Sequence, residues 1–124
     1  MEMKRVLIVE DESDVLEILT EFFKLLHFSV QGVTDGEEAL EVLKSASFHL
    51  YVLDVRLPKL DGFELALRIR ERDPETPIIF LTGLINSETR ARSREISKAY
   101  YLRKPVTFEK IQEILKQLGI IHEN

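Results

Sequence analysis

Residues that could take part in binding or catalysis follow four separate apolar runs of this 124-residue sequence. They are Glu10, Asp11, Asp54, Thr82, Gly83 and Lys104. Carboxylates that lie close together drive one another toward protonation, and burying one is costly unless a charge opposes it. A divalent cation and one lysine would offset this charge. An all-oxygen site with few protein ligands suits Mg²⁺, which keeps several of its waters.

The same set of groups could hold and accept a phosphoryl group. A carboxylate is a known nucleophile toward phosphorus, so Asp54 is the predicted acceptor and would become an aspartyl phosphate. Mg²⁺ and Lys104 would neutralise the charge on the phosphoryl oxygens. Thr82 could donate its hydroxyl to one of these oxygens, and Gly83 would leave backbone N–H groups open to approach because it has no Cβ.

Apolar runs of strand length position these residues. The predicted strands are residues 5–9, 28–33, 50–55, 77–83 and 99–103. Stretches with apolar residues at three- and four-residue steps alternate with them, which is typical of amphipathic helices, and Ser13, Asp61 and either Thr34 or Asp35 are predicted N-caps. Each crossover has the length of one helix. The sequence therefore predicts an α/β fold with a parallel five-stranded sheet, whose strand ends meet at one edge and bind ligands there.

Composition excludes several classes of function. The chain has 44% apolar and 31% charged residues and a net charge of −5, which gives no reason to expect contact with nucleic acid. Cysteine is absent from the sequence, so disulfides and thiolate metal sites are excluded. The first apolar run is too short for a signal peptide or a membrane span, so a cytoplasmic protein without membrane contact is expected. His27, His49 and His122 lack metal-like spacing and are predicted to lie at the surface.

The motifs VLIVEDE, LDVRLPKLDG, LTG and YLRKP, in this order, resemble the CheY-like receiver domain of two-component response regulators. The resemblance extends from about Lys4 to about Leu118. Residues 1–124 are therefore expected to form a single receiver domain. It implies a doubly wound, flavodoxin-like (βα)5 fold with strand order 2-1-3-4-5. Within residues 1–124 no output domain is expected, and a stand-alone receiver and one cut from a larger regulator both remain open.

The resemblance also implies a role for each site residue. Asp54 would accept a phosphoryl group from a histidine of a partner kinase or a histidine phosphotransfer protein. The implied Mg²⁺ ligands are Glu10, Asp11, Asp54 and the backbone carbonyl of Arg56. Tyr101 would be an aromatic switch that turns inward when Thr82 moves, and the Lys104–Pro105 bond would be cis.

Phosphorylation would then bias the surface formed by the fourth helix, fifth strand and fifth helix toward one of two arrangements, which a downstream partner reads. The protein would be a signalling phosphoacceptor whose only reactions are self-phosphorylation from a donor and autodephosphorylation. Homodimerisation on phosphorylation is a further expectation. The sequence identifies neither the kinase nor the output partner.

Residues 84–98 depart from the family pattern. Arg90 and Arg94 lie one helical turn apart at positions predicted to face the sheet, and only Ile85, Ala91 and Ile96 offer apolar contact there. The fourth helix is therefore predicted to be short, shifted or mobile. An alternative is that Arg90, Arg92 and Arg94 form a partner-binding patch.

Two alternative functions share part of this chemistry or fold. A phosphohydrolase of the haloacid dehalogenase type also uses a strand-end aspartate and Mg²⁺, but it needs a second acid two residues after the nucleophile, where this chain has Arg56. A flavodoxin-like nucleotide binder needs a glycine-rich loop after the first strand. This chain has two acids there, which would repel a phosphate.

Overall fold

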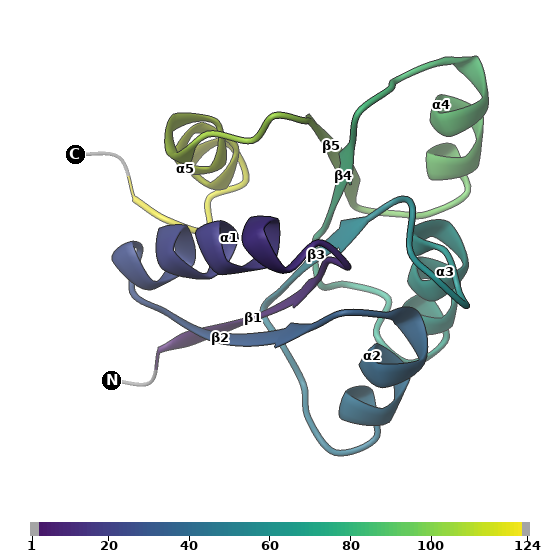
Figure 1. Cartoon of the computed structure of the whole chain (residues 1–124), viewed down its shortest axis with the longest axis horizontal. Coiled ribbons are helices and arrows are strands. Elements are labelled where there is room, and N and C mark those ends of the chain that lie inside the picture. The colour runs from purple at the N-terminus through teal and green to yellow at the C-terminus, as the bar shows by residue number, and fades with distance from the viewer. Residues whose placement is uncertain (1–2, 123–124) are drawn as a thin grey trace.

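Residues 3–122 are described by a computed structural model, in which five strands alternate with five helices (Figure 1). The strands are β1 (Lys4–Val9), β2 (Phe28–Val33), β3 (Leu50–Asp54), β4 (Ile78–Thr82) and β5 (Ala99–Arg103). The helices are α1 (Ser13–Leu25), α2 (Gly36–Leu43), α3 (Gly62–Arg72), α4 (Ser87–Arg94) and α5 (Phe108–Gln117). All neighbouring strands are parallel, in the order β2-β1-β3-β4-β5. The predicted fold class and strand order are confirmed.

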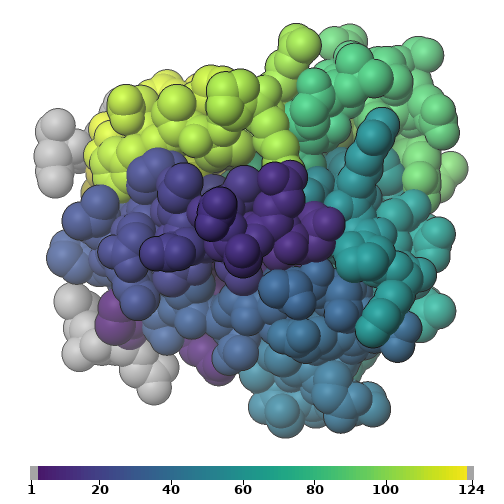
Figure 2. Space-filling view, in the orientation of Figure 1, coloured from purple at the N-terminus to yellow at the C-terminus, as the bar shows by residue number. Residues whose placement is uncertain are grey.

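Helices cover both faces of the sheet, with α1 and α5 on one face and α2, α3 and α4 on the other (Figure 1). Because β3 and β4 are covered on both faces, every one of their residues is buried, and both read as continuous apolar runs in the sequence. One apolar cluster lies on each side of the sheet. The space-filling view shows α1 and α5 side by side on the near face and α4 at the outer edge of the molecule (Figure 2).

The carboxyl ends of the strands meet at one edge of the sheet. Consecutive strands are tied there by backbone hydrogen bonds, from Val55 N to Leu81 O at 3.0 Å and from Lys104 N to Thr82 O at 2.8 Å. The chain passes from β1 to β2 on one side of β1 and then crosses from β2 to β3 on its other side, so the direction of strand addition reverses between β1 and β3. Open α/β sheets bind ligands beside such a switch point.

Helix starts agree only in part with the predicted caps. The side chains of Asp35 and Asp61 accept hydrogen bonds from Glu38 N and Glu64 N, as expected of N-caps. The prediction for Ser13 is wrong, because Ser13 is the first helical residue of α1 and Glu12 precedes it without a side-chain cap. No helix within residues 3–122 combines the length and the apolar character needed to cross a bilayer.

The fourth helix is short, as predicted, with eight residues and none of them buried. The prediction that Arg90 and Arg94 face the sheet is wrong, since both are exposed. Arg92 is half-buried and pairs with Asp61 instead, and a partner-binding patch of the three arginines stays a prediction. Asn86 begins α4 with a capping box, in which its side chain accepts from Thr89 N and its own N–H donates to the Thr89 hydroxyl.

Candidate functional site

The three predicted carboxylates come together at the carboxyl edge of the sheet. Glu10 and Asp11 follow β1, and Asp54 ends β3, directly across the switch point. One carboxylate oxygen from each of the three lies within 4.8 Å of the others. Glu10 is fully buried, Asp54 is 5% exposed and Asp11 is open to solvent. The site therefore has a closed side at Glu10 and an open side at Asp11.

Lys104 supplies the opposing charge. It follows β5, and its ammonium lies 3.0 Å from Glu10 Oε1 and 3.0 Å from Asp54 Oδ2. The side chain is about three-quarters buried. Burial alone would lower the pKa of Lys104, but its contacts with Asp54 and Glu10 outweigh that effect and raise the pKa. Lys104 is therefore a permanent cation between the two buried acids.

Glu10 has an unusual electrostatic environment. Burial raises its pKa to about 7, the neighbouring Asp54 carboxyl adds to this shift, and Lys104 opposes it. Its Oε2 accepts a hydrogen bond from Glu12 N at 3.2 Å. Its Oε1 is buried and receives no hydrogen bond, although the Lys104 ammonium is near. This oxygen therefore has the Lys104 ammonium, 3.0 Å away, as its charged partner, and a further cation bound among the acids would favour the ionised form of Glu10.

These residues fit a magnesium ion. Three carboxylates within reach of one another, those of Glu10, Asp11 and Asp54, form a hard-oxygen donor set. Mg²⁺ takes such ligands and retains water in its remaining positions, which the exposed Asp11 side would allow. Arg56 N donates to Asp54 Oδ1 at 3.1 Å, so the backbone at Arg56 is held against the same carboxylate.

Thr82 and Gly83 lie at the end of β4 on the wall of the same cleft. The Thr82 hydroxyl donates to Leu84 O at 2.8 Å and accepts from Leu84 N at 3.2 Å, so it is held by the loop that precedes α4. A Cβ on Gly83 would meet nothing within 4 Å. A methyl group at this position would thus meet no protein atom, and the expectation that Gly83 leaves its backbone N–H open to a phosphoryl group stays a prediction.

Tyr101 lies in the middle of β5, where it packs against Phe80 with ring centroids 5.9 Å apart. Its hydroxyl donates to the backbone carbonyl of Thr89, within α4. The side chain is half-buried and already directed toward α4. The Lys104–Pro105 peptide bond is cis, as the resemblance implied. The three histidines are exposed, as predicted.

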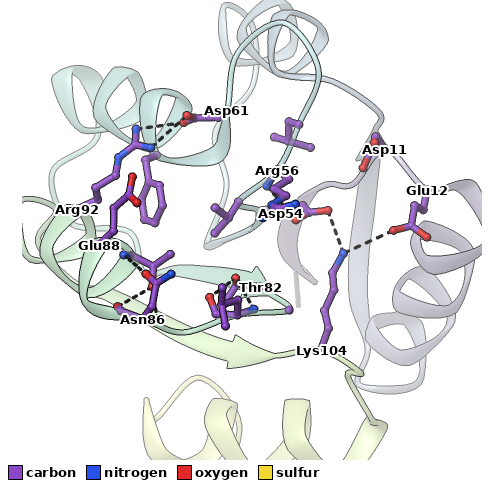
Figure 3. A pocket seen from close by; sticks show the side chains of 16 residues that line it. Asp11, Glu12, Asp54, Arg56, Asp61, Thr82, Asn86, Glu88, Arg92 and Lys104 are labelled. Atoms are coloured by element: carbon purple, nitrogen blue, oxygen red, sulfur yellow. Dashed lines mark hydrogen bonds and ion pairs between the residues drawn. The ribbon is translucent and has the colours of Figure 1, made fainter.

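Two contributors were missed by the sequence argument. Glu12 lines the cleft and its carboxylate lies 4.0 Å from the Lys104 ammonium (Figure 3). Gly62 begins α3 at a close approach of two backbone segments, where a Cβ would lie 2.2 Å from the carbonyl oxygen of Asp54. The three consecutive acids of "EDE" could have indicated Glu12, but the contact at Gly62 depends on the tertiary fold.

The site opens into a cleft of about 790 Å³. Figure 3 shows Asp54, Lys104 and Glu12 on one side of it and Arg92 and Asp61 on the other. Leu57, Phe63 and Leu84 add apolar lining. The cleft is thus much larger than the acid cluster, and its far wall is built from α3 and α4.

Comparison with known proteins establishes the family. The sequence profile of response regulator receiver domains matches residues 6–116. The chain belongs to this family. This receiver domain is 32% identical over 122 residues to the response regulator receiver protein CpdR of Brucella abortus, covering 94% of this chain and 98% of the relative. It is 31% identical over 117 residues to the transcriptional regulatory protein CssR of Bacillus subtilis, covering 94% of this chain and 52% of that protein. The chain spans about half the length of most of the curated relatives it matches.

Solved structures agree with this assignment. The response regulator TrrA of Thermotoga maritima, in complex with Mg²⁺ and beryllium fluoride, superposes with a TM-score of 0.83 at 31% identity, covering 94% of this chain and 99% of that one. The receiver domain of the sensor histidine kinase PA1611 of Pseudomonas aeruginosa, with magnesium in its active-site cleft, also gives a TM-score of 0.83, at 27% identity and 94% and 97% coverage. The phosphohydrolase alternative has no support in these comparisons.

Proposed function

We propose that this receiver domain accepts a phosphoryl group on Asp54 from a phosphohistidine of a sensor kinase or a histidine phosphotransfer protein. The observation that carries the proposal is the position of Asp54 beside two other acids and 3.0 Å from the Lys104 ammonium. An acid at the end of a buried strand, opposite a lysine and within a hard-oxygen cluster, has the surroundings of a nucleophile for phosphorus.

In the transfer, an Asp54 carboxylate oxygen attacks phosphorus, the new P–O bond forms and the P–N bond to the donor imidazole breaks. The imidazole leaves with the bonding electron pair and takes up a proton. Lys104 orients the Asp54 carboxylate beforehand and then pairs with a phosphoryl oxygen. The Thr82 hydroxyl and the N–H of Gly83 are the other proposed donors to phosphoryl oxygens.

Glu10, Asp11, Asp54 and the backbone carbonyl of Arg56 would hold Mg²⁺. When bound, the ion neutralises charge on the phosphoryl oxygens. The cluster of three acids supports this assignment. TrrA and the PA1611 receiver, which resemble this chain, were both solved with magnesium.

Thr82 and Tyr101 would transmit the change. To donate to a phosphoryl oxygen, the Thr82 hydroxyl must give up the hydrogen bond that it donates to Leu84 O, which would loosen the loop before α4. Tyr101 contacts α4 through Thr89 and can follow that movement. The surface of α4, β5 and α5 would then change its arrangement and be read by a downstream partner.

The test is intact-mass measurement after incubation with acetyl phosphate, with and without Mg²⁺. We expect a Mg²⁺-dependent gain of one phosphoryl group that Asp54→Asn abolishes. The matched control is Asp14→Asn, which removes an exposed acid of α1 and should leave the gain unchanged. A gain that persists in Asp54→Asn would place the acceptor elsewhere.

A further inference from the structure

Helix α4 is held to the protein in an unusual way. None of its eight residues is buried, and the nearest core residue, Ile96, lies two residues beyond its end. Helices of globular proteins are ordinarily fixed by an apolar face. Within residues 3–122, α4 is fixed instead by polar contacts, and the most extensive of these contacts are made by Arg92.

Arg92 spans the far wall of the cleft from α4 to the start of α3 (Figure 3). Its two terminal nitrogens lie 3.3 Å and 3.4 Å from the two carboxylate oxygens of Asp61. Its guanidinium carbon lies 4.5 Å from the centre of the Phe63 ring, which is itself buried. A planar guanidinium can form a two-pronged pair and stack on an aromatic ring at the same time, which lysine cannot do.

The partners of Arg92 are fixed. Asp61 also accepts a hydrogen bond from Glu64 N at 2.9 Å as the N-cap of α3, and Phe63 packs on Phe80 with centroids 4.8 Å apart. A displacement of α4 would therefore pull Arg92 away from its partners and would not carry them along. Contacts made in only one of two arrangements shift the equilibrium toward that arrangement.

The arrangement that Arg92 stabilises is the one in which the Thr82 hydroxyl is held by the backbone of Leu84. The Thr82 hydroxyl is bonded to Leu84, and only Ile85 separates Leu84 from the cap of α4 at Asn86. Turning Thr82 toward a phosphoryl oxygen must therefore move a short loop that is joined directly to α4.

We propose that Arg92 is a positioning residue that restrains α4 in the unphosphorylated arrangement, and that its contacts with Asp61 and Phe63 break when a phosphoryl group binds at Asp54. The proposal rests on the function proposed above and adds a regulator of it. Arg92 touches no reacting group. The free energy needed to break its contacts reduces the net binding free energy of the phosphoryl group whenever α4 has to move.

The test compares Arg92→Ala with Arg90→Ala by isothermal titration with Mg²⁺ alone and with Mg²⁺ plus beryllium fluoride, a phosphoryl analogue. Both variants remove one arginine from α4 and place alanine, the best helix former, in its stead. Arg90 is exposed and forms no ion pair with any residue from 3 to 122, so it controls for the loss of charge.

Arg92→Ala should bind Mg²⁺–beryllium fluoride roughly 3- to 10-fold more tightly than the wild type, since an ion pair and a cation–π contact no longer oppose the change. Its affinity for Mg²⁺ alone should be unchanged, and amide exchange across residues 84–98 should be faster before the analogue is added. Arg90→Ala should match the wild type in all three measurements. If Arg92 had only a structural role, Arg92→Ala would change the amide exchange rates, but its affinity for Mg²⁺–beryllium fluoride would not increase relative to its affinity for Mg²⁺ alone.

If Arg92→Ala bound the analogue no more tightly than the wild type, this inference would be overturned and the proposed function would stand. The same holds if Arg90→Ala gained as much affinity as Arg92→Ala. Failure of the wild type to bind the analogue at all would overturn the proposed function, and the inference with it. The wild-type titration therefore separates the two failures.

Discussion

The Lys104 ammonium lies 3.0 Å from Asp54 Oδ2, a contact that joins the end of β5 to the end of β3 across the intervening strand β4. The same ammonium lies 3.0 Å from Glu10 Oε1. One cation therefore serves two buried acids. We expect the arrangement of these three side chains to affect both the stability of the metal-free protein and the phosphorylation proposed for Asp54.

Replacing Lys104 with methionine should destabilise the protein in the absence of divalent cations. The methionine side chain has a similar length but leaves Glu10 and Asp54 without an opposing charge, so we expect the free energy of unfolding to fall by about 1 to 3 kcal/mol. Urea denaturation in EDTA measures this loss. Added Mg²⁺ should stabilise Lys104→Met more than the wild type, since the ion then supplies the missing charge.

The control for this experiment is Lys24→Met, which removes an exposed lysine near the end of α1. Its free energy of unfolding should stay within about 0.5 kcal/mol of the wild-type value. If Lys104→Met is as stable as Lys24→Met, the contacts of Lys104 with the two acids contribute nothing to folding.

Glu10 should make the metal-free protein less stable as the pH rises. Its pKa is about 7 in the folded protein and 4.5 when unperturbed. Between these values the folded protein keeps a proton that the unfolded chain has lost, so stability falls as the pH increases from about 4.5 to about 7. Glu10→Gln cannot ionise, so at pH 8 it should be more stable than the wild type by on the order of 2 kcal/mol.

Urea denaturation in EDTA at pH 4.5, 6 and 8 would measure this difference, which should be small at the lowest pH. Subtracting one protein from the other removes the contribution of the remaining carboxylates. Mg²⁺ should reduce the difference at pH 8, because a bound cation favours the ionised acid. A difference that is constant across this range would mean that Glu10 titrates normally.

Two glycines near the site should respond differently to alanine. At Gly62 a Cβ would lie 2.2 Å from the Asp54 carbonyl oxygen and 3.0 Å from the Val55 Cα, so the backbone must shift. At Gly83 a Cβ would enter open space. We expect Gly62→Ala to lose about 2 to 4 kcal/mol of stability and most phosphorylation at Asp54, and Gly83→Ala to change stability by less than about 1 kcal/mol.

Urea denaturation and intact mass after acetyl phosphate treatment would test both variants, each serving as the control for the other. Equal effects would show that the approach of Gly62 to the Asp54 carbonyl does not constrain the site. If Gly83→Ala alone strongly reduced phosphorylation, the approach to Asp54 would require a residue without a side chain at position 83.

The sequence predicted the fold and the position of the acids because both depend on local patterns. Runs such as "LYVLD" mark buried parallel strands, and polar residues directly after such strands must lie at one edge of the sheet. The predicted bounds were close to those of the structure, with β3 ending at Asp54 itself.

The orientation of α4 could not be predicted in the same way. Apolar residues set which face of a helix turns inward, and the only apolar residue within α4 is Ala91, which is exposed. The inward position belongs to Arg92 because Asp61 and Phe63, about thirty residues earlier, offer it a charge and an aromatic ring. The choice of Arg92 over Arg90 and Arg94 is therefore a tertiary effect.

At the opposite edge of the sheet, Asp73 should contribute stability that is lost in acid. Its carboxylate accepts hydrogen bonds from the hydroxyl of Tyr51 at 3.0 Å and from the backbone N–H groups of Glu75 and Thr76 at 3.2 and 3.1 Å. Burial opposes ionisation, but these hydrogen bonds outweigh it and lower the pKa of Asp73. Burial and the nearby Asp73 charge raise the pKa of Tyr51, which therefore remains a donor.

Because the folded pKa of Asp73 lies below its unfolded value, its contribution is complete above about pH 4 and disappears as the pH falls through the folded pKa. Asp73→Asn should be less stable than the wild type by about 1 to 2 kcal/mol at pH 7, and the two proteins should converge as the pH falls below 4. Urea denaturation from pH 7 to pH 2.5 would show this convergence.

Glu71→Gln is the matched control, since its exposed side chain contacts no charged partner within residues 3–122, and its curve should stay parallel to that of the wild type. Parallel curves for Asp73→Asn would instead mean that the Asp73 carboxylate gains nothing from Tyr51 and the turn that follows α3.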